Sequence, residues 1–306
     1  MRVYLIVFMV NYEGIRKSRA LALRREIMKF AKYWEKQDVA VSEKVFGKSA
    51  ISVWGASNES SQAAKKNVEK RLAAMQAFLG GDFDKNDEYE YWMDFVKEEI
   101  IDEIKSNDDR VLAILSRNSY GATVLNTDSV LFGDIDVPPS SFIDRILEKF
   151  GKPLKDKTYY LKNIEKYQES HPNLSFRVYE THSGLRFIVT NRTFSPRDSV
   201  VREMFTDLNV DPLYMRLCQQ QECFRARLSP KPWRVSFERP SSRYPRAKGR
   251  EQQEFQQWLD RYHTLSMNSA VTKHLASFGP GKLHPDVQIV TDLHDRHSCS
   301  SADSLA

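Results

Sequence analysis

The amino-acid sequence predicts an α+β fold in which a mixed or antiparallel sheet core of ββ hairpins is flanked by helices, with helical additions towards both ends. Three observations support this. Short apolar and β-branched runs, separated by turn residues, fill the middle of the chain, as expected for strands. Apolar residues recur at helical spacing before and after that region. The 306 residues are 41% hydrophobic and include 17 Phe and 13 Tyr, enough for a substantial core.

Residues 1–110 are expected to form an N-terminal α/β region that packs on the core. The apolar run at 4–10 has only seven residues, too few for a signal peptide or a membrane span, and is interpreted as a buried strand. The elements expected after it are a helix at 15–34, strands at 39–45 and 50–54, a helix capped by Asn58 or Ser60 that ends at Leu79, and an acidic amphipathic helix at 88–106.

Residues 111–238 are expected to form the core that carries the functional site. Turn residues and the Pro138-Pro139 stop divide this region into strands and short helices. The expected elements are strands at 111–116, 122–125 and 130–137, a helix ending at Phe150, a Lys-rich connection at 152–166, a hairpin of 175–180 with 185–190, a helix at 198–208, a loop, and a strand at 224–228.

Residues 239–306 are expected to form a basic linker and a helical C-terminal segment that frays from Ser298. The charge is uneven here, because residues 216–250 contain ten Lys or Arg against two Glu, a local net of +8. Such a block suits an anionic partner, either a nucleic acid or a nucleotide phosphate. The alternative for the part after Arg239 is a solvated basic loop.

Cysteine usage and hydropathy predict a protein of the cytoplasm. Three cysteines, Cys218, Cys223 and Cys299, are too few for a disulfide framework, and their number is odd. No stretch is apolar enough to span a bilayer, so no membrane partner is expected. Cys218 and Cys223 could form a zinc site with His294, His297 or Cys299, but the favoured interpretation is two ordinary half-buried thiols.

The first candidate site is the run 131–138, which contains Asp134 and Asp136. Side chains alternate along a strand, so both carboxylates project from one face while Ile135 points to the other. Two neighbouring carboxylates repel unless a cation lies between them, and Mg²⁺ or Mn²⁺ prefers such oxygen ligands. The alternative is an exposed edge strand with two solvated aspartates.

The second candidate is a group of cations at 225–234. Arg225 and Arg227 alternate with apolar residues and so share one strand face, where two guanidinium groups can bind phosphate oxygens. Lys231 and Arg234 follow between prolines and extend the predicted phosphate site. The alternative is that the arginines only neutralise the two aspartates as structural ion pairs.

Two turns contribute further candidates. In the hairpin at 175–190, Ser183 and the following glycine can bring backbone N–H groups close to a phosphate, with Arg186 beside them. His182 is a candidate proton carrier or ligand, or else plain surface. The turn at 117–121 offers ligand contacts through the polar side chains Arg117, Asn118 and Tyr120, although asparagines here also suit turn capping.

The Asp134–Asp136 strand followed by the Ser183-Gly184 hairpin resembles the catalytic layout of the archaeo-eukaryotic primase superfamily, over residues 110–235. The resemblance implies an RRM-like sheet, two divalent metals at the first motif and nucleotide contacts at the second. It also implies a third acidic ligand within 205–211, for which Asp207 is preferred. One departure is that the family usually places a His in the strand after the glycine, where this chain has Arg186. Segments around residues 117–127, 132–138 and 227–234 also resemble uncharacterised bacterial proteins.

Three functional hypotheses follow from these residues. The leading one is a Mg²⁺- or Mn²⁺-dependent phosphoryl- or nucleotidyl-transfer enzyme acting on nucleotides or on single-stranded or primed nucleic acid, with Asp134 and Asp136 as ligands. The second is a nucleic-acid-binding module without catalysis that uses residues 216–250. The third is a structural or regulatory protein in which the acids and arginines form a buried ion network.

Overall fold

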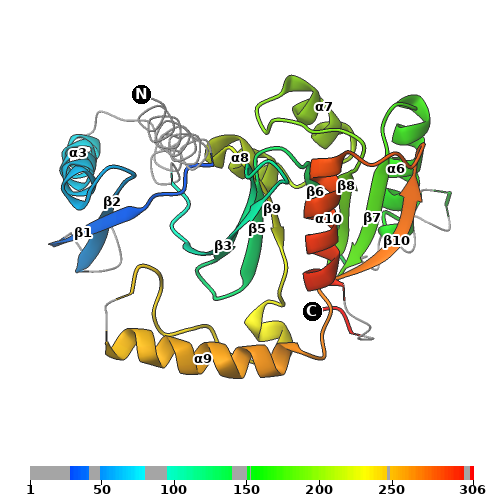
Figure 1. Ribbon diagram of the computed structural model, residues 1–306. Helices are drawn as coiled ribbons and strands as arrows, with labels where there is room; N and C mark the ends of the chain where they lie inside the picture. The colour runs from blue at the N-terminus through cyan, green and yellow to red at the C-terminus, as the bar shows by residue number, and fades with distance from the viewer. Residues whose placement is uncertain are drawn as a thin grey trace, which may run out of the picture. The chain divides into compact units, whose positions relative to one another are not determined.

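The computed structural model describes residues 28–40, 49–79, 95–139, 150–151, 153–246, 249–299 and 304–306. Antiparallel sheets are flanked by helices, which confirms the α+β class predicted from the sequence (Figure 1). The chain divides into two compact units, Met1–Lys97 and Glu98–Ala306. None of the described helices is long and apolar enough to cross a membrane.

The first unit contains a β-hairpin and one helix. Strands β1 (Tyr33–Ala40) and β2 (Ala50–Ser57) pair antiparallel, and α3 (Ser61–Leu79) packs on them. The packing is close, because a Cβ at Gly55 would lie 2.1 Å from the carbonyl oxygen of Ala64. Ser60 caps α3 as predicted, since its hydroxyl accepts a hydrogen bond of 3.1 Å from the Ala63 amide.

Two antiparallel four-stranded sheets form the framework of the second unit. One contains β3 (Glu99–Lys105), β4 (Val111–Arg117), β5 (Thr123–Thr127) and β9 (Phe224–Arg227), in that order. The other has the order β10-β7-β8-β6, with β6 (Phe132–Asp136), β7 (Phe176–Thr181), β8 (Gly184–Val189) and β10 (Thr272–Phe278).

The second sheet contains a split β-α-β unit. Helix α6 (Lys157–Ser170) connects β6 to β7, and β8 inserts between these two strands. This is the order of the first three strands of an RRM-like sheet. The fourth strand differs, because β10 pairs with β7 at the outer edge rather than lying beside β6.

Helices cover both faces of this second sheet. Helix α10 (Pro285–Ser298) lies beside β6 and β8 (Figure 1). Its His294 ring contacts Phe132 and lies 3.4 Å from the Arg186 guanidinium, so α10 covers the face of the sheet from which Arg186 projects. On the opposite face, α7 (Ser199–Asp207) contributes Phe205, whose ring packs against Phe187. The apolar core of the second unit therefore extends on both sides of β8.

The two sheets meet at β6 and β9, and one tyrosine joins them. Tyr214, on helix α8 (Pro212–Gln221), places its hydroxyl 3.0 Å from the carbonyl oxygens of Phe132 in β6 and Arg225 in β9. The Arg225 amide donates to the same hydroxyl at 3.2 Å. The hydroxyl thus bridges β6 and β9, which belong to different sheets. The candidate site lies beside this tyrosine.

Most of the predicted core strands are confirmed, but the helix at 88–106 is wrong over its described C-terminal half. Residues 99–105 form β3, which pairs with β4. Its register shifts between Ile100 and Asp102 and again between Ile104 and Lys105, as at a β-bulge. A bulge interrupts the alternation of side chains, so the isoleucines of this strand imitate helical spacing.

The Lys-rich connection at 152–166 and the loop before 224 were also predicted wrongly. The first contains α6, which Asp156 caps by accepting a hydrogen bond from the Tyr159 amide, and the second contains α8. Strand β10 was not predicted, and it joins the C-terminal segment to the same sheet as Asp134. The second unit runs from Glu98 to Ala306 and so includes the C-terminal segment.

Some predicted elements lie outside the described residues. These are the strand at 4–10, most of the helix at 15–34, most of the strand at 39–45 and nearly all of the helix that ends at Phe150. Of the helix at 15–34, residues 28–34 are described, and none of them is helical: 28–32 form a turn with an isolated bridge, and Tyr33 and Trp34 belong to β1.

Candidate functional site

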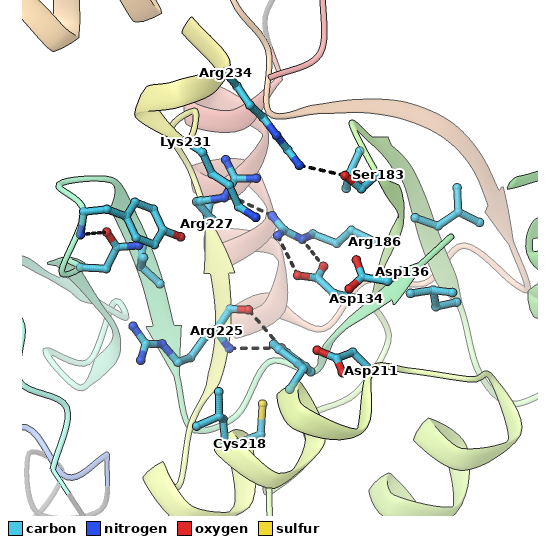
Figure 2. Close-up of a pocket in the computed structure, with 18 of the residues that line it drawn as sticks. Asp134, Asp136, Ser183, Arg186, Asp211, Cys218, Arg225, Arg227, Lys231 and Arg234 are labelled. Carbon is cyan, nitrogen blue, oxygen red and sulfur yellow. Dashed lines mark hydrogen bonds and ion pairs between the residues drawn. The ribbon is translucent and has the colours of Figure 1, made fainter. Parts of the chain in front are cut away.

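A pocket of about 450 Å³ opens where β6, β8 and β9 meet. Its walls also include the first turn of α8, the turn at 118–120 and the segment that leads into the short helix η1 (Pro232–Val235). Figure 2 shows acidic side chains on one side of this space and basic side chains on the other. Both groups come from segments that are far apart in the sequence.

Three carboxylates form the acidic wall. Asp134 and Asp136 project from the same face of β6, as their spacing predicted, and their carboxylates lie side by side (Figure 2). The third is Asp211, the N-cap of α8, whose side chain accepts a hydrogen bond of 3.0 Å from the Leu213 amide. The Asp211 amide donates to the Asp134 carbonyl oxygen at 3.1 Å, which fixes the start of α8 against β6.

Asp134 is bound by a buried arginine. Arg186 stands directly opposite it on β8 and donates from Nε and Nη2 to the two carboxylate oxygens, at 2.7 and 3.0 Å. Burial by itself would lower the pKa of Arg186, but Asp134 more than offsets this and raises it. Arg186 also donates to the Arg227 carbonyl oxygen at 3.0 Å. It therefore holds β6, β8 and β9 together.

Asp136 has no comparable partner among the residues that the structure describes. Partial burial raises the pKa of its carboxyl, and repulsion from Asp211 and Asp134 raises it further, while Lys231 and Arg234 lower it. A carboxylate whose charge is disfavoured by two like charges is a favourable place for an added cation.

Three cations form the basic wall: Arg227, Lys231 and Arg234. None of them forms an ion pair with any residue in the described part of the chain. Burial lowers the pKa of each, and mutual repulsion lowers the pKa of Arg227 and Lys231 further. Arg227 donates to the Ser229 carbonyl oxygen at 2.9 Å, and Arg234 to the Ser183 hydroxyl at 2.8 Å. Their positive charge is thus compensated only in part, which suits an anionic ligand.

Arg225 lines the same pocket but is held by other partners. It donates to Glu98 at 2.5 Å and to the Gln221 side chain at 2.9 Å. Burial acts to lower its pKa, but Glu98 more than compensates, so the pKa is raised. Arg225 and Arg227 were expected to act together on a phosphate, and the structure gives Arg225 a carboxylate of its own.

The hairpin β7–β8 brings Ser183 to the edge of the pocket. Gly184 is required here, because a Cβ at this position would lie 1.9 Å from the Ile135 carbonyl oxygen of β6. His182 is exposed and does not line the pocket, although its Nδ1 lies 3.1 Å from the Ser183 hydroxyl. Partial burial, and then repulsion from Arg234 and other cations, lowers the pKa of His182.

The turn at 118–121 contributes Asn118 and Tyr120 to the lining, but not Arg117. Asn118 also caps the turn, because its side-chain oxygen accepts hydrogen bonds from the Tyr120 and Ala122 amides. Arg117 is buried and donates to the Gly121 carbonyl oxygen at 3.0 Å. Arg117 therefore stabilises the turn and does not line the pocket.

The acidic residue after β8 that lines the pocket is Asp211, whereas the sequence interpretation preferred Asp207. Asp207 ends α7, and its charge acts on Tyr167 on the far side of the sheet. A signal for Asp211 was present: an Asp followed by Pro212 is a typical N-cap and first helical residue. That pattern predicts the start of α8 and so places a carboxylate at a helix end.

Cys218 and Cys223 are both fully buried, and burial raises the pKa of both thiols, that of Cys223 to about 12. Such thiols are poor nucleophiles. Within the described ranges, no group of three or more His, Cys, Asp or Glu side chains is placed to hold a metal ion by itself.

Comparison of the chain with protein-family models, with curated proteins and with solved structures found no significant match.

Proposed function

We propose that the second unit is a metal-dependent phosphoryl- or nucleotidyl-transfer enzyme that acts on nucleotides or nucleic acid. One observation carries this proposal. A single pocket joins the carboxylates Asp136 and Asp211 to the basic wall of Arg227, Lys231 and Arg234. Chemistry at a phosphate bound with a divalent cation requires both kinds of group.

The donors suit Mg²⁺ or Mn²⁺. Asp134 shares both its oxygens with Arg186, so Asp136 and Asp211 are the better ligands. Mg²⁺ commonly takes only one or two carboxylates and completes its shell with water and substrate phosphates. Two protein ligands therefore suffice, which agrees with the lack of a complete protein cage among the described residues. When bound, the cation would neutralise charge that develops on the phosphoryl group.

The basic wall would orient the phosphates. Arginine binds phosphate oxygens through paired N–H groups, and lysine adds a point charge. Arg227, Lys231 and Arg234 lie in one short segment that contains two prolines, which restrict the backbone. The cations are thus positioned before any ligand arrives, which reduces the entropic cost of binding.

The motif at Asp134–Asp136 also supports the proposal, because it resembles the metal-binding motif of the primase superfamily. Arg186 stands where that family usually has a His, and here it binds the first aspartate of the motif. In this chain the second aspartate and Asp211 would therefore do more of the metal binding than the first.

The test is metal-dependent binding of a nucleoside triphosphate. We expect the wild-type protein to bind it more tightly with Mn²⁺ than without, and Asp136→Asn to lose at least about tenfold of that Mn²⁺-dependent affinity. The substitution should not unfold the chain, because partial burial and the neighbouring carboxylates Asp211 and Asp134 disfavour the Asp136 charge and raise its pKa. Asp207→Asn, an exposed aspartate outside the pocket, is the matched control and should bind like wild type.

The same titration distinguishes the proposed enzyme from the alternative, a nucleic-acid-binding module without catalysis. That module predicts binding that falls steeply with salt, needs no Mn²⁺ and does not change in Asp136→Asn. If triphosphate binds equally with and without Mn²⁺, the metal-dependent proposal is wrong.

A further inference from the structure

An exposed aromatic residue stands beside the basic wall. Trp233 lies in η1 between Lys231 and Arg234, and 45% of its surface is exposed. Its ring meets that of Tyr120 edge-on, with centroids 5.2 Å apart. Tyr120, Lys231 and Arg234 all line the pocket, so Trp233 is at its rim.

The other described tryptophan of the second unit is placed differently. Trp258 is stacked on Tyr262, at 5.0 Å between centroids, and on Phe237, at 5.6 Å. It has the aromatic neighbours that a tryptophan normally gains in folding. Trp233 keeps nearly half of its surface in solvent instead. A ligand that covered this surface would gain the free energy of burying it.

Cations surround this ring. The guanidinium of Arg239 lies over it, 4.6 Å from the centroid, and the Lys231 ammonium lies at 5.7 Å. An aromatic platform among cations is the arrangement by which proteins bind bases that are attached to a phosphate backbone. Inorganic phosphates offer no aromatic surface to such a platform.

We infer that Trp233 stacks on the nucleobase of the ligand whose phosphates are bound by Lys231 and Arg234. Tyr120 supports the indole ring from its edge and connects it to the pocket. The ligand is therefore a nucleotide, either free or at the end of a strand, rather than an inorganic polyphosphate. This inference rests on the proposed function, since it names the class of substrate for the same pocket.

The experiment compares two probes in the presence of Mn²⁺, a nucleoside triphosphate and inorganic tripolyphosphate. Loss of a stacked base costs roughly five- to hundredfold in affinity. We expect Trp233→Ala to lose that factor for the nucleoside triphosphate and to bind tripolyphosphate like wild type. Trp233→Phe should recover part of the loss. Phe150→Ala, which removes an aromatic ring that is 81% exposed and does not line the pocket, is the matched control.

The outcomes separate the inference from the proposal on which it rests. If wild type binds both probes equally, or if Trp233→Ala weakens both equally, base stacking is overturned while phosphate binding stands. If wild type binds neither probe, the proposed function fails and the inference fails with it. A short single-stranded oligonucleotide serves as a third probe. If Trp233→Ala weakens binding of the oligonucleotide more than binding of the triphosphate, stacking is supported, and the stacked base belongs to a nucleic-acid strand rather than to a free nucleotide.

Discussion

Asp134 and Arg186 stand directly opposite each other on β6 and β8 and form two hydrogen bonds, of 2.7 and 3.0 Å. The guanidinium side chain is 3% exposed, and the carboxylate side chain is 32% exposed. Both side chains line the pocket, but the aspartate is the more exposed of the two. The two aspartates of the motif therefore have different tasks, because Asp134 balances a buried charge and Asp136 is left for a ligand.

The pair predicts strong coupling in a double-mutant cycle. Asp134→Asn leaves a buried guanidinium that cannot discharge, and we expect it to lower the free energy of unfolding by about 3 kcal/mol. Arg186→Met leaves the Asp134 carboxylate without its partner. Because water reaches that carboxylate, we expect the unpaired charge to lower the free energy of unfolding less than in Asp134→Asn. The double variant should be more stable than the sum of the single effects indicates. Urea denaturation measures all three, and additive effects would show that the pair is not coupled.

His294 predicts a loss of stability in mild acid. The residue is buried on α10 against Phe132, Tyr179, Arg186 and Asp295. Burial lowers its pKa to about 4, with Arg186 adding repulsion against the opposing effect of Asp295. Between pH 6.5 and 4 the unfolded chain binds a proton that the folded chain does not, so stability falls with falling pH, by up to about 3 kcal/mol.

Thermal or urea unfolding of wild type and His294→Gln, followed from pH 7 to pH 4.5, measures this effect. The variant should lose less stability than wild type over that range, because its side chain does not titrate. Equal losses would show that other groups cause the pH dependence. The pKa of Asp136 is raised, so its protonation increases the stability of both proteins as the pH falls and opposes the effect of His294.

Gly184 predicts a steric requirement at the edge of the pocket. A Cβ there would lie 1.9 Å from the Ile135 carbonyl oxygen, so β6 and β8 would have to separate. We expect Gly184→Ala to cost about 3 kcal/mol or more, and to release Asp136 from its position. Gly151→Ala is the control: its φ of 85° is unsuited to alanine, which is not the case at Gly184, but no atom lies within 4 Å of the added Cβ. It should cost only about 1 kcal/mol. Similar losses in the two variants would contradict the steric explanation.

The hairpins and the shared face of the two aspartates could be predicted from the sequence because they depend on local periodicity. Asp134 and Asp136 are two residues apart in a strand, and that spacing alone puts them on one face. The strand of Arg225 and Arg227 was predicted for the same reason. In each case the turn residues and the alternation of apolar side chains act over fewer than about ten residues.

The partners of these residues could not be predicted in this way. The sequence interpretation paired the aspartates with Arg225 and Arg227, whereas Arg186 binds Asp134 and Glu98 binds Arg225. Strand order and register determine which charges meet, and these depend on contacts between distant segments. Strand β3 was missed because a bulge disturbs its pattern, and β10 because pairing with β7 stabilises a short polar strand.

The sequence by itself determined an α+β chain with two aspartates on one strand face and a cluster of cations some ninety residues later. Tertiary structure decided that Arg227, Lys231 and Arg234 share a pocket with Asp136 and Asp211, and that Trp233 stands at its rim. The reason is physical: side-chain direction follows from backbone geometry within an element, whereas the meeting of charges depends on how the sheets and α8 pack together.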